Sequence, residues 1–444
     1  MQTADWDIEI RGGTLLTMAE KADIVENPVI GIKDGLIVAV SAYRQEQRGG
    51  QRAEEVIDAS GCVIIPGLVN THTHLPMVCF RGIADDLPLL EWLHKHIFPA
   101  EARFVDKKMV YEGALLAMAE MILSGTTTFC DSYFFEGKIG EAAQQAGMRA
   151  VIAQGFIDFP APDNADAAQN MAAAARFLAK WQNVSPLITP AFFCHAPYTC
   201  SPQTMISVKE AANRAGIFFL IHLLENEDEI ETIQKRYGKK PVELLNDLNI
   251  LDEHTIAIHC NWVDKKDMAV FAARGVKVSH NPESSMKLAS GVAPIPEMLQ
   301  LGISCGLGTD GAASNNDLDM FREMDTAAKL HKVTALNPTV MNAQTVLHMA
   351  TVGGSKVLGL ADRIGSIEVG KEADMILVDM NKPHLTPLYN YYSQLVYAAS
   401  GADVKTSIIG GKIVMRDRQL RTIDAAKAME NVRLIAAAIN KEKV

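Results

Sequence analysis

The 444-residue sequence is 48% hydrophobic and 21% charged, an ordinary composition for a globular protein with one large domain and a smaller appendage. Its formal net charge is −11, from 42 basic against 53 acidic side chains, and no cluster of Lys and Arg stands out. These values argue against a surface for nucleic acid or for an anionic membrane, and they favour a small-molecule ligand.

The cysteines and the N-terminus indicate the compartment. The seven cysteines are scattered and form no C-x-x-C pair, which predicts reduced thiols. The first residues include acids where a signal peptide needs a basic start, and no apolar run approaches the roughly 18 residues of a membrane span. We therefore expect a cytoplasmic protein with no membrane partner. A homo-oligomer, a dimer or a tetramer, is expected only from the frequency of closed symmetric assemblies.

Short strands separated by glycines open the chain. Five such segments lie before residue 66, at 6–10, 14–18, 29–33, 36–40 and 55–58. The same pattern of short strand segments recurs near the other end of the chain, at 373–379 and 406–414. We predict that residues 1–61 and 362–444 pair into one small β-sandwich, followed by a terminal helix over 425–441.

Between these ends, apolar runs alternate with helical stretches, the pattern of repeated βα units and a parallel sheet. Eight runs can be counted, at 63–74, 126–132, 149–155, 187–195, 218–225, 255–261, 276–281 and 303–310. Helix candidates lie at 110–124, 165–181, 202–215, 241–247 and 265–274. Eight parallel strands with outer helices close a barrel, so residues 62–361 are predicted to form a (β/α)8 TIM barrel, an α/β fold. In that architecture the chemistry gathers at the carboxyl ends of the strands.

Two histidines, His72 and His74, stand at the carboxyl end of the first run. Side chains alternate along a strand, so both project to the same side, about 7 Å apart along the chain. His222 lies near the end of the fifth run and Asp310 ends the eighth. A lone His or Asp after a strand is more often a capping or hydrogen-bonding residue. The set of three imidazoles and one carboxylate suits Zn²⁺ best, so we predict that these four residues hold one divalent metal ion.

Three further roles follow from such a metal site. Bound Zn²⁺ lowers the pKa of water from about 15.7 to roughly 7 and so supplies hydroxide. Glu225, three residues beyond His222, is predicted to be the general acid that protonates a ring nitrogen. His259, in the sixth run, is expected to orient the water and stabilise the forming alkoxide, and Asp310 to carry a proton to the leaving amine. The alternative for Glu225 is a solvated helix-cap carboxylate in an acidic patch with residues 227–229.

Six stretches of the chain match one family, at 66–74, 80–87, 91–93, 99–101, 195–199 and 308–316. They resemble the amidohydrolase superfamily, nearly end to end, and within it the 5′-methylthioadenosine/S-adenosylhomocysteine deaminases. The resemblance implies an enzyme that hydrolyses the 6-amino group of an adenosine-type nucleoside to the inosine form and releases ammonia. The candidate substrates are 5′-methylthioadenosine, adenosine and S-adenosylhomocysteine.

The resemblance also implies roles for residues that contact the substrate. Glu101 would hold the ribose hydroxyl groups, because each carboxylate oxygen can accept one hydroxyl hydrogen. The remaining nucleoside contacts would come from His195, Glu225, Asp310 and Ser314.

Two segments narrow this interpretation. Barrel hydrolases with two metals usually bridge them with a modified lysine after the fourth strand, and residues 194–198 contain none, which favours one metal. Some members carry arginines after the third strand that reach the substrate tail, and residues 153–160 contain none. A carboxylate-bearing tail would lose a bidentate partner. We therefore expect 5′-methylthioadenosine or adenosine to be preferred over S-adenosylhomocysteine.

Rival interpretations differ in the ring or in the class of protein. A guanine-type deaminase or a triazine chlorohydrolase would use the same scaffold, but such substrates have no ribose for Glu101. A non-catalytic scaffold protein of the dihydropyrimidinase-like kind would lack metal ligands, whereas all four are present. The zinc deaminases that flip bases require Pro-Cys-x-x-Cys, which this sequence does not contain.

Overall fold

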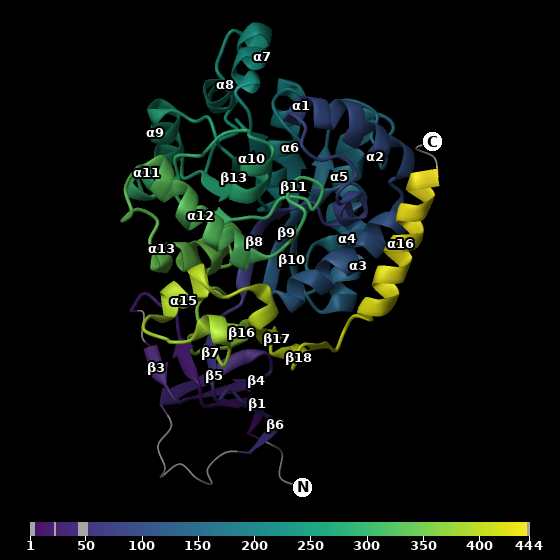
Figure 1. Cartoon of the computed structure of the whole chain (residues 1–444). Coiled ribbons are helices and arrows are strands. Elements are labelled where there is room, and N and C mark those ends of the chain that lie inside the picture. Colours follow the sequence, from purple (N-terminus) through teal and green to yellow (C-terminus); the bar gives the residue numbers. More distant parts are fainter. Residues whose placement is uncertain (1–4, 22–23, 43–51, 442–444) are drawn as a thin grey trace.

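The computed structural model describes residues 5–21, 24–42 and 52–441, and it places a helix-covered barrel on a smaller β-sandwich (Figure 1). Both ends of the chain contribute to the sandwich, and the middle of the chain forms the barrel. The predicted fold class, a (β/α)8 barrel with a β-sandwich built from both ends, is confirmed.

The barrel is a parallel eight-stranded sheet in which each strand pairs with its neighbours in chain order. Its strands are β8 (Leu68–Thr73), β9 (Thr126–Tyr133), β10 (Arg149–Phe156), β11 (Ile188–Cys194), β12 (Phe219–Leu223), β13 (Thr255–His259), β14 (Lys277–His280) and β15 (Cys305–Leu307). A parallel bridge between Thr73 and Asp310 brings the chain after β15 beside the end of β8. The barrel therefore closes where two of the predicted metal ligands lie.

Helices lie around the barrel (Figure 1). They are α1 (Leu89–Trp92), α2 (Phe98–Phe104), α3 (Lys107–Leu123), α4 (Glu136–Ala146), α5 (Asn170–Trp181), α6 (Pro202–Ala215), α7 (Asp228–Tyr237), α8 (Pro241–Asp247), α9 (Lys265–Arg274), α10 (Pro282–Lys287), α11 (Ile295–Gln300), α12 (Met320–Thr334), α13 (Ala343–His348) and α14 (Gly354–Val357). Predicted helices at 202–215, 241–247 and 265–274 match α6, α8 and α9. No helix in the described part of the chain is both long and apolar enough to cross a membrane.

The sandwich packs a four-stranded sheet, in the order β5-β4-β1-β6, against a seven-stranded sheet, in the order β19-β18-β17-β16-β7-β2-β3. The first part of the chain supplies β1 (Trp6–Arg11), β2 (Thr14–Leu16), β3 (Ile24–Glu26), β4 (Pro28–Lys33), β5 (Leu36–Ala42), β6 (Ala53–Asp58) and β7 (Cys62–Pro66). The last part supplies β16 (Met375–Asp379), β17 (Val404–Ile409), β18 (Lys412–Arg416) and β19 (Gln419–Leu420). Buried isoleucines such as Ile10 and Ile30 meet Ile64 and Ile408 between the sheets.

One strand prediction is wrong. Residues 63–74 form two strands, because β7 pairs with β16 in the sandwich while β8 pairs with β9 in the barrel. The chain changes sheets at Gly67, where a Cβ atom would overlap the side chain of Thr127. Only glycine fits this close approach. The division of the chain at residues 61 and 361 stays a prediction.

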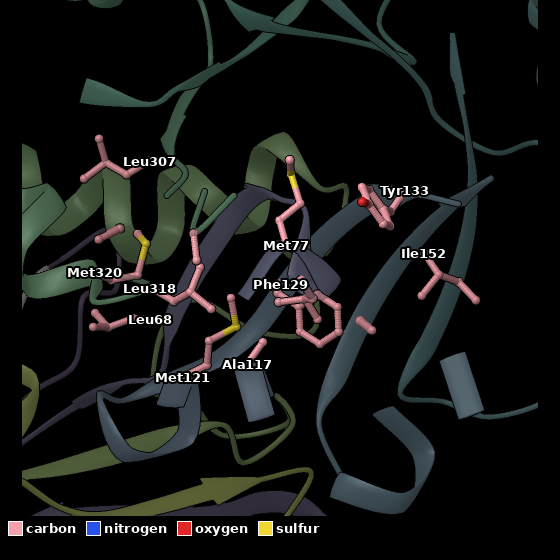
Figure 2. Close-up of a cluster of buried hydrophobic side chains, with 14 of the residues drawn as sticks. Leu68, Met77, Ala117, Met121, Phe129, Tyr133, Ile152, Leu307, Leu318 and Met320 are labelled. Carbon is pink, nitrogen blue, oxygen red and sulfur yellow. The ribbon is translucent and has the colours of Figure 1, made fainter. Parts of the chain in front are cut away.

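Alternation along the strands separates two cores of the barrel. Phe129 and Ile152 point outward into the layer between strands and helices, where Met121 of α3 also packs (Figure 2). Cys130 and Val151, their neighbours in sequence, belong to the core that fills the barrel interior. Side chains therefore fill the interior of the barrel. Its open end lies at the carboxyl ends of the strands.

The end of the chain returns to the barrel. After α15 (Tyr391–Tyr397) and the last sandwich strands, α16 (Ala425–Lys441) runs along the outside of the barrel beside α3 (Figure 1). Asn431 Nδ2 donates to Glu112 Oε2 at 2.7 Å across this contact. The predicted terminal helix is confirmed.

A buried ion pair links barrel and sandwich. Arg149, 1% exposed at the start of β10, donates to both carboxylate oxygens of Asp374 at 2.7 and 2.8 Å and pairs with Glu372 at 2.7 Å. Removing one partner leaves buried charge uncompensated.

We predict that Arg149→Ala lowers the free energy of unfolding by about 3–5 kcal/mol, measured by chemical denaturation. Lys235→Ala, at an exposed ion pair with Glu231, is the control and should leave the midpoint almost unchanged. Equal stability of both variants would contradict this role.

Candidate active site and metal centre

The predicted metal ligands meet at the open end of the barrel. His72 lies in β8, His74 follows it directly, His222 lies in β12, and Asp310 comes three residues after β15. His72 Nε2 lies 3.3 Å and His74 Nε2 lies 3.4 Å from Asp310 Oδ1. His222 Nε2 lies 3.3 Å from His72 Nε2. The structure thus brings together four side chains that are up to 238 residues apart in the sequence.

The hydrogen bonds of His74 test whether a cation fits this cluster. His74 Nδ1 lies 2.6 Å from the carbonyl oxygen of Ser132, so Nδ1 must carry the proton and Nε2 a lone pair. That lone pair faces the carboxylate oxygen of Asp310. Two acceptors so close repel each other unless a cation lies between them. Ligand bonds of about 2.1 Å in a tetrahedron place ligand atoms about 3.4 Å apart, so the observed separations fit a metal ion such as zinc.

Burial favours the neutral form of His72 and His222. It lowers the pKa of His72 to about 4, and it holds the pKa of His222 well below its usual range. Burial alone would raise the pKa of Asp310, but the hydrogen bond to His72 and the nearby imidazoles hold it well below its usual range. Neutral imidazoles and an ionised carboxylate are the forms that bind a metal.

His259 adds a fourth imidazole to this group. His72, His222 and His259 also lie close enough to share one ion. However, Asn281 Nδ2 donates to His259 Nδ1 at 3.2 Å, which places the His259 proton on Nε2. His259 can therefore donate a hydrogen bond from Nε2, which suits a role beside the ion more than a role as ligand.

Glu225 follows β12 and faces His259. Its Oε1 lies 3.9 Å from His259 Nε2, and its side chain is 10% exposed. Burial holds the pKa of Glu225 well above its usual range, with further contributions from the charges of Asp310 and Glu229. A carboxyl group with a raised pKa can keep its proton near neutral pH. The alternative of a solvated cap for Glu225 does not agree with this burial.

The predicted substrate contacts surround the same space. A cavity of ≈ 320 Å³ is lined by Glu101, His195, Glu225, Asp310 and Ser314 together with His74, His222 and His259. Glu101 reaches it from α2, and His195 from the end of β11. Tyr133 Oη donates to Glu101 Oε1 at 2.7 Å, and burial raises the pKa of Glu101 to about 7 despite this bond. His195 Nδ1 lies 2.9 Å from Thr199 Oγ1.

The outer part of the cavity is apolar. Aromatic and aliphatic side chains line it, among them Trp92, Ile97, Phe98, Phe134, Ile157 and Phe159. No Lys or Arg belongs to the lining in the described residues. Asp163, also in the lining, adds a further carboxylate. The described lining of the cavity therefore offers apolar contact and negative charge, and it has no Lys or Arg to pair with an anion.

Sequence reasoning missed three residues that hold the site. Ser284 Oγ donates to Asp310 Oδ2 at 2.6 Å, beside Ser314 Oγ at 2.9 Å. Tyr133 supports Glu101, and Asn281 sets the tautomer of His259. Tyr133 and Asn281 end or follow barrel strands, so their position was a usable signal. Ser284 lies in α10, and nothing in its sequence context points to Asp310.

A (β/α)8 barrel with a histidine cluster and a carboxylate gathered at its strand ends, joined to a sandwich from both chain ends, has the architecture of a metal-dependent barrel enzyme. The chain belongs to the amidohydrolase family, which matches it over residues 63–414.

Close relatives are known by sequence and by structure. The chain is 48% identical to a 5-methylthioadenosine/S-adenosylhomocysteine deaminase from Syntrophobacter fumaroxidans, over 98% of each chain. It is 45% identical to a 5'-deoxyadenosine deaminase from Methanosarcina mazei, over 97% of this chain and 98% of the relative. The crystal structure of an adenosine deaminase from Xanthomonas campestris with bound zinc is 37% identical and superposes with a TM-score of 0.96, covering 98% of this chain and 99% of the other.

The predicted role of His222 as a metal ligand can be tested directly. We expect His222→Ala to weaken metal binding by more than about 100-fold, because one donor of the set is lost. Metal content after dialysis, measured by elemental analysis, checks this. His195→Ala is the matched control, since His195 lines the same cavity outside the cluster and should leave the metal in place. A His222→Ala chain with a full complement of metal would contradict the assignment.

Proposed function

We propose that the chain is a metal-dependent deaminase that hydrolyses the 6-amino group of an adenosine-type nucleoside and releases ammonia. The relatives named as deaminases of such nucleosides support this reaction. The observation that carries the proposal is the presence of Glu101, bound to Tyr133, in one cavity with the histidine cluster and Glu225. This combination suits a ring at the cluster and a ribose diol at Glu101.

The metal would be held by His72, His74, His222 and Asp310. Zinc is the ion proposed, since three imidazoles and a carboxylate suit it and a relative of known structure contains it. When bound, such an ion lowers the pKa of water and so makes a nucleophile available at neutral pH. A single ion is proposed, because the end of β11 carries His195 and no lysine.

Three side chains would move or hold protons. Glu225, whose carboxyl keeps its proton, donates it to a ring nitrogen next to the carbon under attack. His259 donates from Nε2 to the oxygen that adds to that carbon. Asp310 accepts one proton of the attacking water and passes it to the leaving amine. As the C–N bond breaks and the C=O bond forms, the proton left on the added oxygen returns to Glu225, so both carboxyl groups are restored. Ser284 and Ser314 hydroxyls hold Asp310 Oδ2, so they fix the plane of this carboxylate.

The rest of the cavity would select the substrate. Glu101 accepts hydrogen bonds from the two ribose hydroxyls, while His195 and Ser314 contact the nucleoside. The apolar outer wall suits a neutral 5′ group, and the lining supplies no cation for a carboxylate. Burying an unpaired carboxylate is costly. We therefore favour 5′-methylthioadenosine and adenosine over S-adenosylhomocysteine.

The alternative reactions use the same fold. A guanine-type deaminase or a triazine chlorohydrolase would leave Glu101 buried without a diol, at a cost in binding. A non-catalytic scaffold has no use for the histidine cluster. A homo-oligomer and a cytoplasmic location stay predictions.

Ammonia release across a panel of compounds tests the function. We expect turnover of 5′-methylthioadenosine and adenosine, weaker turnover of S-adenosylhomocysteine, and none of guanine or chlorotriazines. Glu101→Gln should lower kcat/KM for ribonucleosides by about 10- to 100-fold, because a charged acceptor for the diol is lost. For a 2′,3′-dideoxynucleoside the loss should be small. Preferred turnover of a base or a triazine would refute the proposal.

The role of Glu225 has its own test. Glu225→Gln should lower kcat by about 10²- to 10⁴-fold, since an amide cannot supply the proton. The bound metal should remain, because Glu225 is not a proposed ligand. Steady-state kinetics together with elemental analysis of the same preparation measure both. An unchanged kcat would remove Glu225 from the mechanism.

A further inference from the structure

The carboxyl group of Glu225 sits on an unusual turn between β12 and α7. Leu224, the residue before it, has a φ of 53°, in the left-handed region that a branched residue rarely adopts. Such conformations persist only where the surroundings hold them, and they concentrate at functional sites. The groups that hold this turn lie on both sides of it.

Glu229 holds the turn from its N–H side. This residue lies in the first turn of α7 and is 2% exposed. Its Oε2 accepts the backbone N–H of Leu224 at 2.9 Å, and the backbone N–H of Glu225 faces the same carboxyl group. The backbone N–H of Glu229 donates to Asn226 Oδ1 at 3.1 Å, which closes the loop on itself.

Asn261 holds the turn from its carbonyl side. It follows β13 and is 5% exposed. Its backbone N–H donates to Leu224 O at 2.9 Å, and its Nδ2 donates to Glu225 O at 2.9 Å. Nδ2 also lies 3.1 Å from Ser285 Oγ, which ties the turn to α10. The backbone around Glu225 is thus bonded on both sides by buried side chains.

Neither side chain belongs to the reacting surface. Glu225 lines the cavity, whereas Glu229 and Asn261 lie behind it and do not. Glu229 supplies a buried carboxyl group and Asn261 a buried amide, and both bond to the same backbone turn. Such hydrogen bonds can hold a catalytic side chain in place. Their distance from the cavity leaves them no direct contact with a substrate.

We propose that Glu229 and Asn261 are positioning residues that fix the carboxyl group of Glu225 against the reacting ring. This inference rests on the role of Glu225 as proton donor given above. Without the hydrogen bonds from Glu229 and Asn261, the turn at Leu224 relaxes toward an ordinary conformation, and the carboxyl group of Glu225 moves with it. Misplacement by about 1 Å can cost about 100-fold in rate.

Kinetics of Glu229 variants test the proposal. Glu229→Ala should lower kcat by about 10- to 100-fold and leave KM within about 2-fold, because the proton donor is misplaced while the contacts that bind substrate stay. Glu229→Gln keeps one acceptor oxygen and should recover kcat to within about 5-fold of the wild type. Rates are expressed per bound metal ion, so that only folded sites count. The control is Glu231→Ala, on the same helix with a 69% exposed side chain, which should change neither constant.

A double-mutant cycle separates positioning from general destabilisation. In a Glu225→Gln background the donor is already lost, so adding Glu229→Ala should lower kcat by less than about 3-fold. Full additivity of the two losses would overturn the proposal, as would a wild-type kcat per bound metal in Glu229→Ala.

Asn261→Asp provides a second route should Glu229→Ala not fold. Aspartate cannot donate from the Nδ2 position to Glu225 O, so kcat should fall by about 10-fold, again with little further loss in the Glu225→Gln background. An unchanged kcat would contradict the positioning role of Asn261. These comparisons can use whichever compound the wild-type enzyme hydrolyses. Failure of the nucleoside assignment therefore shows in the substrate panel and leaves this test intact.

Discussion

The structure depends on one close contact, in which imidazole nitrogen atoms face a carboxylate oxygen. The Nε2 atom of His74, whose tautomer is set by the Ser132 carbonyl, faces the ionised Asp310 carboxylate at 3.4 Å. His72 and His222 bring two more nitrogen atoms to the same place. Nitrogen lone pairs packed against an anion are unfavourable alone, and a divalent cation between them makes the arrangement favourable. The chemistry of the site follows from that single requirement.

Hydrogen bonds that close the barrel hold these side chains together. The backbone N–H of Asp310 donates to His72 O at 3.0 Å, where the chain after β15 returns to β8. One layer below, Asn70 Nδ2 donates to Thr309 Oγ1 at 2.8 Å and Thr309 N donates to Asn70 Oδ1 at 3.1 Å. Both side chains are fully buried. Backbone pairing and the hydrogen-bonded side chains of Asn70 and Thr309 beneath it therefore fix the positions of two proposed ligands.

Much of this could be predicted from the sequence, because periodicity and chemistry coincide. Alternation in β8 places His72 and His74 on one side, and separate apolar runs end near His222 and Asp310. Two features could not be predicted in this way. The apolar run across Gly67 gives no sign that it changes sheets, since both halves have the pattern of a buried strand. Glu101 was found only through the family resemblance, because its helix carries no local signal of a diol site.

The supports of the site were the hardest part to predict. Ser284, Asn281 and Glu229 each act through hydrogen bonds to a neighbour distant in sequence or to a backbone turn. Such contacts depend on the packing of loops at the barrel mouth, and residue type alone does not specify them. They are polar and buried, and in a sequence they look like ordinary loop residues.

Reconstitution with metal tests the central claim most directly. The chain is stripped with a chelator and titrated with zinc while ammonia release is followed. We expect the stripped chain to be inactive and its activity to rise linearly with added zinc to a plateau at one ion per chain. Full activity of the metal-free chain, or a plateau reached only at two ions per chain, would contradict it.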